Sequence, residues 1–142
     1  MLYFDTSYLV RLYTQDPGWE RVRVLAQTDR LACCLHGQAE TLAAFHRKFR
    51  EGAIQANELK TLLSEFDRDS VAGAFRWLPL SASVIGRMAS TYATLPATVA
   101  LRAADAMHLA CAADAGITKV FSNDARLLAA ASYFGVVGED IL

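Results

Sequence analysis

Four acidic residues stand near the end of an apolar segment or within one: Asp5, Glu40, Asp105 and Asp124. Hard divalent cations such as Mg²⁺ and Mn²⁺ bind preferentially to carboxylate and water oxygens. If the four side chains converge, they could hold one or two such ions. The chemistry then available is attack of metal-activated water on a phosphate ester, with no histidine or lysine needed as the base.

Three of these acids have a structural explanation as well as a chemical one. Asp5 directly follows an apolar run, and Asp124 follows a run that ends near Ser122. In open parallel sheets, ligands bind beyond the carboxyl ends of the strands, so both positions suit a site. An aspartate there can also cap the helix that follows. Glu40 lies in a first helical turn, where the helix dipole alone favours an acid.

Asp105 lies in a nearly apolar helical segment that spans residues 101–110. Leu101 and Leu109, four residues to either side, share its face of the helix. A carboxylate on a core-facing stripe is costly unless a cation or hydrogen bonds compensate it. Arg102 could be that cation in a purely structural ion pair, so the structural and metal-binding interpretations both remain open.

Short apolar runs alternate with longer helical stretches along the chain. The expected strands are residues 2–4, 31–35, 75–80, 119–122 and 136–137. The expected helices are residues 8–13, 19–28, 38–50, 55–66, 103–115 and 125–131, with a further helix after residue 81 that Ser81 or Ser83 can cap. This alternation predicts an α/β fold with a mostly parallel sheet and helices on both faces. No repeat or linker divides the chain, so residues 1–142 are expected to form a single domain.

Composition narrows the class of protein. Hydrophobic residues make up 54% of the chain, yet no apolar run approaches the roughly 20 residues that cross a bilayer. The first residues lack the features of a signal peptide, and a cytoplasmic protein without membrane contact is expected. The formal net charge is −1, so any nucleic-acid contact must use local basic patches or metal ions. Three cysteines form no disulfide framework and are expected to be reduced core residues.

Four segments, in this order, resemble the motifs of PIN-domain ribonucleases: Asp5-Thr6-Ser7 after the first strand, the lone Glu40 at the start of the third helix, Arg102 to Ala110 around Asp105, and Ser122-Asn123-Asp124. The resemblance extends over essentially the whole chain. In size, the chain is most similar to the toxin ribonucleases of VapBC-type toxin–antitoxin pairs. Ser122 replaces the threonine that is often found at its position, and either hydroxyl can orient a carboxylate.

The resemblance implies a parallel sheet of about five strands and an acidic pocket that binds Mg²⁺ or Mn²⁺. Asp5, Asp105 and Asp124 are expected to form the core of the metal site, with Glu40 as a ligand directly or through water. Thr6, Ser7 and Ser122 are expected to be supporting hydroxyls. The implied substrate is single-stranded or loop RNA. The implied assembly is a homodimer inhibited by a small antitoxin protein.

Further side chains are assigned with a structural alternative beside each. RNA contacts are expected from Arg47, Lys48, Arg50, Arg102 and Arg126, although such residues are also typical of a solvated helix face. His108 lies three residues after Asp105, and a core or hydrogen-bonded histidine is favoured there over a metal ligand. Cys34, His36 and His46 do not match the spacing of a zinc site and are left out. The apolar content, together with the resemblance, favours an antitoxin groove between the helices around residues 19–25 and 59–66, although these side chains could also only fill the core or a dimer interface.

Two rival functions belong to other classes. One is a magnesium-dependent phosphohydrolase of small molecules, in which Asp5 would be a nucleophile after the first strand. Such phosphatases need a second aspartate two positions later, where this chain has Ser7. The other is a non-catalytic protein-binding module, against which four retained acids argue. Activity on a phosphomonoester would favour the first rival, and absence of metal binding would favour the second.

Overall fold

Five short apolar segments pair into one parallel sheet. A computed structural model describes residues 1–142 and gives the strand order β3-β2-β1-β4-β5. The strands are β1 (Leu2–Phe4), β2 (Leu31–Cys34), β3 (Phe75–Leu78), β4 (Lys119–Phe121) and β5 (Val137–Glu139). All four neighbouring pairs are parallel. The α/β class and the parallel sheet of five strands predicted from the sequence are therefore confirmed.

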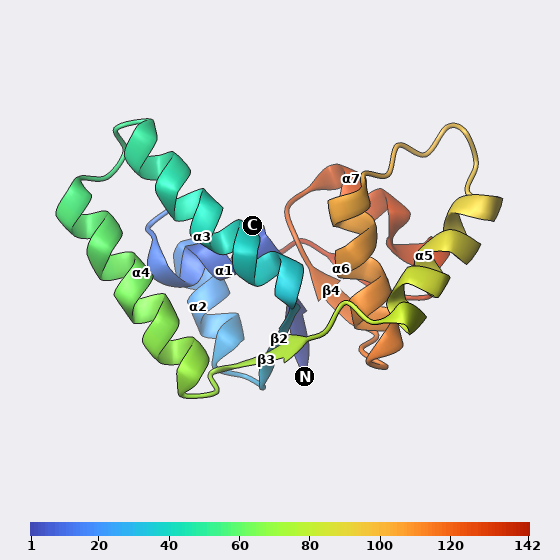
Figure 1. Ribbon diagram of the computed structural model, residues 1–142, viewed down its shortest axis with the longest axis horizontal. Coiled ribbons are helices and arrows are strands. Elements are labelled where there is room, and N and C mark those ends of the chain that lie inside the picture. Colours follow the sequence, from blue (N-terminus) through green and yellow to red (C-terminus); the bar gives the residue numbers. More distant parts are fainter.

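The helices cover both faces of this sheet. They are α1 (Thr6–Tyr13), α2 (Trp19–Ala26), α3 (Leu35–Arg50), α4 (Ala56–Val71), α5 (Ala82–Thr94), α6 (Ala103–Asp114) and α7 (Ala125–Ala130), followed by the 3₁₀ turn η1 (Ala131–Phe134). Helices α1 to α4 lie on one side of the strands, and α5, α6 and α7 lie on the other (Figure 1). Covered on both faces, a parallel strand must be apolar throughout, and all four residues of β2 are buried. None of the helices combines the length and the apolar character that crossing a membrane requires.

Two helices differ by three or more residues from the bounds that the sequence suggested. Helix α3 begins at Leu35, three residues early, because the Cys34 thiol caps its first turn by accepting from the Gly37 N–H at 3.4 Å. Helix α4 continues to Val71 rather than ending near Phe66. Its last turn is mostly polar and contains no buried residue, so no apolar periodicity marks it. Ser81 caps α5 as expected.

The strand order creates a crevice at one edge of the sheet. From β1 the chain moves outward to β2 and β3, and then returns to β4 on the other side of β1. The connections that leave β1 and β4 therefore diverge at the carboxyl ends of these strands. Such a reversal of strand order is where open α/β sheets bind their ligands. Asp5 follows β1 and Asp124 follows the end of β4, so both lie at this point.

Candidate functional site

A pocket of about 540 Å³ opens at the carboxyl edge of the sheet. Its lining includes all four carboxylates identified from the sequence: Asp5, Glu40, Asp105 and Asp124. They come from the ends of β1 and β4 and from helices α3 and α6. Of the three expected supporting hydroxyls, Thr6 and Ser7 line the pocket, while Ser122 is fully buried beside it. The structure thus brings together acids that are up to 119 residues apart in the chain.

Asp5 is buried at the floor of the pocket and fully engaged in hydrogen bonds. One oxygen accepts from the Ser7 hydroxyl at 2.6 Å and from a backbone N–H in the first turn of α1 at 3.1 Å. The other oxygen accepts from the Ser122 hydroxyl. Burial raises the pKa of Asp5, while the charge of His108 and these hydrogen bonds oppose that rise. The capping role suggested by the sequence is therefore real, and Asp5 performs it at the pocket wall.

Asp124 also combines a cap with a place in the pocket. Its Oδ1 accepts from the backbone N–H groups of Arg126 and Leu127 at the start of α7, at 2.8 and 3.4 Å. The Ser122 hydroxyl that donates to Asp5 accepts from the Asp124 N–H at 2.9 Å. One buried hydroxyl therefore fixes the distance between the chain segments that follow β1 and β4.

Arg102 joins Asp105 to Asp124. Its Nε lies 3.0 Å from Asp105 Oδ2, and its Nη2 lies 2.8 Å from Asp124 Oδ2. The ion pair that the sequence left open as a structural alternative is therefore present. The Asp105 side chain is only 8% exposed, whereas that of Arg102 is 57% exposed. The guanidinium thus lies at the mouth of the pocket and supplies positive charge to two carboxylates at once.

Glu40 accepts hydrogen bonds from two side chains and lies close to a second histidine. Its Oε2 accepts from the Thr6 hydroxyl at 2.5 Å and from His108 Nε2 at 2.9 Å, and its Oε1 lies 3.2 Å from His36 Nε2. Partial burial raises the pKa of Glu40, but the hydrogen bonds from His108 and Thr6 and the nearby histidine charges outweigh it and lower the pKa to about 2. The side chain is therefore a carboxylate with a fixed orientation.

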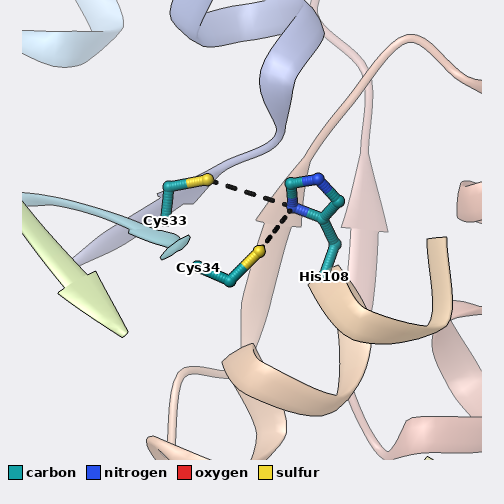
Figure 2. Close-up of side chains that lie close together, drawn as sticks. All are labelled: Cys33, Cys34 and His108. Carbon is teal, nitrogen blue, oxygen red and sulfur yellow. Dashed lines mark hydrogen bonds between the residues drawn. The ribbon is translucent and has the colours of Figure 1, made fainter. Parts of the chain in front are cut away.

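His108 is the buried link behind Glu40. On the side away from Glu40, its Nδ1 lies 2.9 Å from the Tyr3 hydroxyl. Figure 2 shows that the Cys33 and Cys34 thiols also point to Nδ1, at 3.9 and 3.6 Å. Burial opposes the charged ring, but the hydrogen bonds of Cys34 and Glu40 raise the pKa of His108 to about 10. The sequence-based preference for a hydrogen-bonded core histidine is confirmed.

The thiols and His108 form a cluster of soft donors. Their three donor atoms lie within 4.8 Å of one another. All three cysteines of the chain are free and buried, as expected. The Tyr3 hydroxyl already satisfies Nδ1, and both thiols are almost completely buried, so hydrogen bonding accounts for this cluster.

Two residues of the site were missed by sequence reasoning. His36 had a usable signal, because a residue four positions before Glu40 lies on the same face of a helix. Tyr3 had none, since a tyrosine in a buried strand usually only packs. Its hydroxyl reaches His108 across 105 positions of sequence.

The expected basic residues divide between the pocket and its surroundings. Arg47, Lys48 and Arg102 line the pocket together with Arg11, and Lys48 also pairs with Asp16 at 2.5 Å. Arg50 lies in an adjoining depression with His46 and Arg47. The Arg126 side chain lines neither, although its backbone N–H contacts Asp124.

The donor set of the pocket fits a hard divalent cation. Its acids offer carboxylate oxygens, and the Arg102 guanidinium already stands between two of them as a positive charge. The surrounding hydroxyls of Thr6, Ser7 and Ser122 orient the carboxylates in the way that outer partners orient metal ligands. No cysteine or methionine lines the pocket, and its one histidine, His108, is engaged with Glu40 and Tyr3.

Solved structures share this fold at low sequence identity. VapC20 of Mycobacterium tuberculosis, a sarcin-ricin loop cleaving toxin, is 15% identical over 92% of this chain and 95% of its own, with a TM-score of 0.70. VapBC2 of Rickettsia felis, solved with a DNA fragment from its promoter, is 13% identical over 99% and 98%, with a TM-score of 0.69. FitAcB of Neisseria gonorrhoeae is 19% identical over 97% and 96%, with a TM-score of 0.74. At these identities the likeness establishes the fold alone.

Sequence comparison identifies the family. No curated protein matches the chain. The family model of the PIN domain, in contrast, matches residues 2–132. This range contains strands β1 to β4 and all four carboxylates of the pocket. The chain therefore belongs to the PIN domain family.

Proposed function

We propose that this protein is a divalent-metal-dependent endoribonuclease that hydrolyses RNA phosphodiesters. The observation on which the proposal depends is the meeting of Asp5, Glu40, Asp105 and Asp124 at one pocket of a PIN-domain chain. Asp5, Asp105 and Asp124 would be the core ligands of Mg²⁺ or Mn²⁺, with Glu40 binding directly or through water. When bound, such an ion activates water and stabilises negative charge on the phosphate.

The residues of the chain prepare the site for that ion. Ser7 and Ser122 hold the two oxygens of Asp5 in place, and Thr6 does the same for Glu40. Arg102 offsets part of the negative charge of Asp105 and Asp124 in the absence of a metal ion. Because like charges in a partly desolvated pocket repel, this compensation lowers the cost of keeping the acids close together.

RNA would approach along the basic wall of the pocket. Arg11, Arg47 and Lys48 line the side formed by α1 and α3, and Arg102 lies on the opposite side. The overall net charge is −1, so this local patch has to supply the attraction to phosphate. Arg50 extends the patch along α3, whereas Arg126 would contact RNA only outside the pocket.

We further propose that the protein is a cytoplasmic toxin of a toxin–antitoxin pair and forms a homodimer. The toxin assignment is supported by the structural likeness to VapC20, a cleaving toxin, and to the VapBC2 and FitAcB structures. A small antitoxin would lay an apolar helix or tail against α2 and α4. Val24 on α2 is 65% exposed, and Leu59, Leu62 and Leu63 on α4 are partly exposed, which leaves apolar surface on both helices.

The activity is tested with purified protein and structured RNA substrates. Cleavage should require Mg²⁺ or Mn²⁺, stop in EDTA, and fall by orders of magnitude in Asp5→Asn and Asp105→Asn. Arg30→Gln, exposed at the amino end of β2 and outside the pocket, is the matched surface control and should retain most of the activity. Undiminished cleavage in EDTA by a preparation free of contaminating nucleases would contradict the metal mechanism. Hydrolysis of a chromogenic phosphomonoester without RNA cleavage would instead favour a small-molecule phosphohydrolase.

The partner is tested in the native operon. Expression of the chain together with its neighbouring reading frame should yield a complex in which cleavage is inhibited. A chain that purifies alone from that operon, and is harmless when expressed by itself, would contradict the toxin assignment while leaving the nuclease assignment intact.

A further inference from the structure

We propose that His108, fixed by the hydroxyl of Tyr3, is a positioning residue that sets the orientation of Glu40 for metal binding. The inference rests on the proposed function, because it assigns Glu40 to the metal site. It goes further by giving a role to two buried residues, Tyr3 and His108, that were not among the expected site residues. The link runs from β1 through α6 to α3.

The first step is the geometry of the hydrogen bonds. His108 Nε2 lies 2.9 Å from Glu40 Oε2, and His108 Nδ1 lies 2.9 Å from the Tyr3 hydroxyl. The backbone N–H of Cys34 donates to that hydroxyl at 3.2 Å. Because a neutral imidazole has one donor and one acceptor, the partner on Nδ1 decides which nitrogen holds the proton.

The second step is the direction of that proton. If the ring is neutral, the Tyr3 O–H donates to Nδ1, so Nε2 must hold the ring proton and donate it to Glu40. If the ring is an imidazolium, both nitrogens donate, and Nε2 again faces Glu40 as a donor. Glu40 therefore receives a hydrogen bond from His108 in both protonation states, and the contact with Tyr3 holds the ring in the orientation that provides it. Carboxylates that bind metal ions are commonly oriented by hydrogen bonds from such outer partners.

The third step is that the ring cannot turn away. His108 is only 2% exposed, and Tyr3 has no exposed surface at all. A Cβ atom added at Gly37 would lie 2.8 Å from His108 Cε1, so the backbone of α3 is in close contact with the ring. The helix that presses on the ring is the one that contains Glu40. The position of the ring and that of the carboxylate are therefore coupled.

A purely structural role for these groups is the alternative. Buried polar groups need hydrogen-bond partners, and Tyr3 and His108 would satisfy one another without any effect on metal binding. Glu40 also accepts a hydrogen bond from the Thr6 hydroxyl, and the partly exposed His36 lies close to its other oxygen. The two interpretations differ in what removal of the Tyr3 hydroxyl does to the metal ion.

The experiment compares Tyr3→Phe with Tyr8→Phe. Both tyrosines are completely buried, and each hydroxyl makes two hydrogen bonds. The Tyr8 hydroxyl contacts Asp140 and the backbone of Ile141, away from Glu40. The two variants therefore lose the same chemistry from the core, and similar falls in melting temperature are expected. Only Tyr3→Phe should disturb Glu40.

Metal binding is measured first, by Mn²⁺ titration of the metal-free proteins with electron paramagnetic resonance. Tyr3→Phe should bind Mn²⁺ roughly 10-fold more weakly than Tyr8→Phe, as loss of an outer partner typically does. His108→Gln, which keeps an N–H donor near Glu40, should bind more tightly than His108→Leu. In NMR spectra of the metal-free protein, the imidazole Nε2–H signal should shift in Tyr3→Phe and not in Tyr8→Phe.

The outcomes separate this inference from the proposed function. Equal Mn²⁺ affinity in Tyr3→Phe and Tyr8→Phe, with a wild type that binds Mn²⁺ and cleaves RNA, would overturn the positioning role alone. A wild type that neither binds Mn²⁺ nor cleaves RNA would overturn both. Weaker Mn²⁺ binding in Tyr3→Phe with an unchanged Nε2–H signal would also contradict the inference, because the Tyr3 hydroxyl would then not act on Glu40 through His108.

Discussion

Replacement of Ser122 by alanine removes a buried hydroxyl on which two acids of the pocket depend. The Ser122 hydroxyl donates to Asp5 and accepts from the Asp124 N–H at 2.9 Å, and the residue has no exposed surface. Alanine keeps the shape of the side chain and opens almost no cavity. The effect on the free energy of unfolding therefore comes from hydrogen bonding.

The expected loss follows from the charge and the burial of Asp5. A hydrogen bond to a charged group contributes about 1.5–3 kcal/mol, so we expect a loss of about 2 kcal/mol. The Asp124 N–H is partly buried, so water can replace part of its bond. For 142 residues the entropy of unfolding is about 0.3 kcal/mol/K, and the melting temperature should fall by about 7 °C.

The assay is thermal unfolding in EDTA, followed by circular dichroism. Ser90→Ala is the matched control, because the Ser90 hydroxyl is exposed and bonds only to the carbonyl of Gly86. Its melting temperature should barely change. Ser122→Thr restores a hydroxyl and should recover part of the loss.

The pH dependence gives a second check on the same variant. The hydrogen bond from Ser122 lowers the pKa of Asp5, so it stabilises the charged carboxylate. The penalty in Ser122→Ala should therefore be largest above the pKa of Asp5 and should shrink as the pH falls below it. A Ser122→Ala protein that melts together with Ser90→Ala at neutral pH would refute the reasoning.

Two further predictions concern charge in the metal-free protein. The pKa of Glu40 is lowered from 4.5 to about 2, so its contribution to stability is present above pH 4.5 and is lost as the pH falls toward 2. The pKa of His108 is raised from 6.5 to about 10, so its contribution is complete below pH 6.5 and is lost as the pH rises toward 10. Melting temperatures in EDTA should therefore be highest between about pH 4.5 and 6.5. This maximum should flatten in Glu40→Gln. An unchanged pH profile in that variant would contradict the lowered pKa of Glu40 as its cause. Asp105→Asn should melt within a few degrees of the wild type in EDTA, because Arg102 is exposed and keeps its bond to Asp124. Addition of Mg²⁺ at ten times its dissociation constant should stabilise the wild type by about 1.4 kcal/mol and the variant by much less, and a large loss in EDTA with no magnesium response would remove Asp105 from the site.

Local patterns determined most of the fold. Most strands are short apolar runs in the sequence. Asp5 and Asp124 follow two of these runs, and Asp105 lies on a helix whose apolar residues recur with helical spacing. Because parallel strands end at a common edge, the positions of Asp5 and Asp124 alone predicted where a pocket would form. The bounds of α3 and α4 were less accurate, since a cysteine cap and a polar last turn give no periodic signal.

Only the tertiary structure decided how the acids are compensated. Sequence spacing allowed Arg102 to pair with Asp105, but its second bond, to Asp124, depends on how α6 packs beside the end of β4. The contact of Tyr3 with His108 joins a strand to a helix 105 positions away, and no local pattern encodes it. Helical and strand periodicities fix which face of an element a side chain occupies. Which side chain of another element meets it there depends on the packing of the whole core, and that packing turned a buried tyrosine and a buried histidine into neighbours of the acidic pocket.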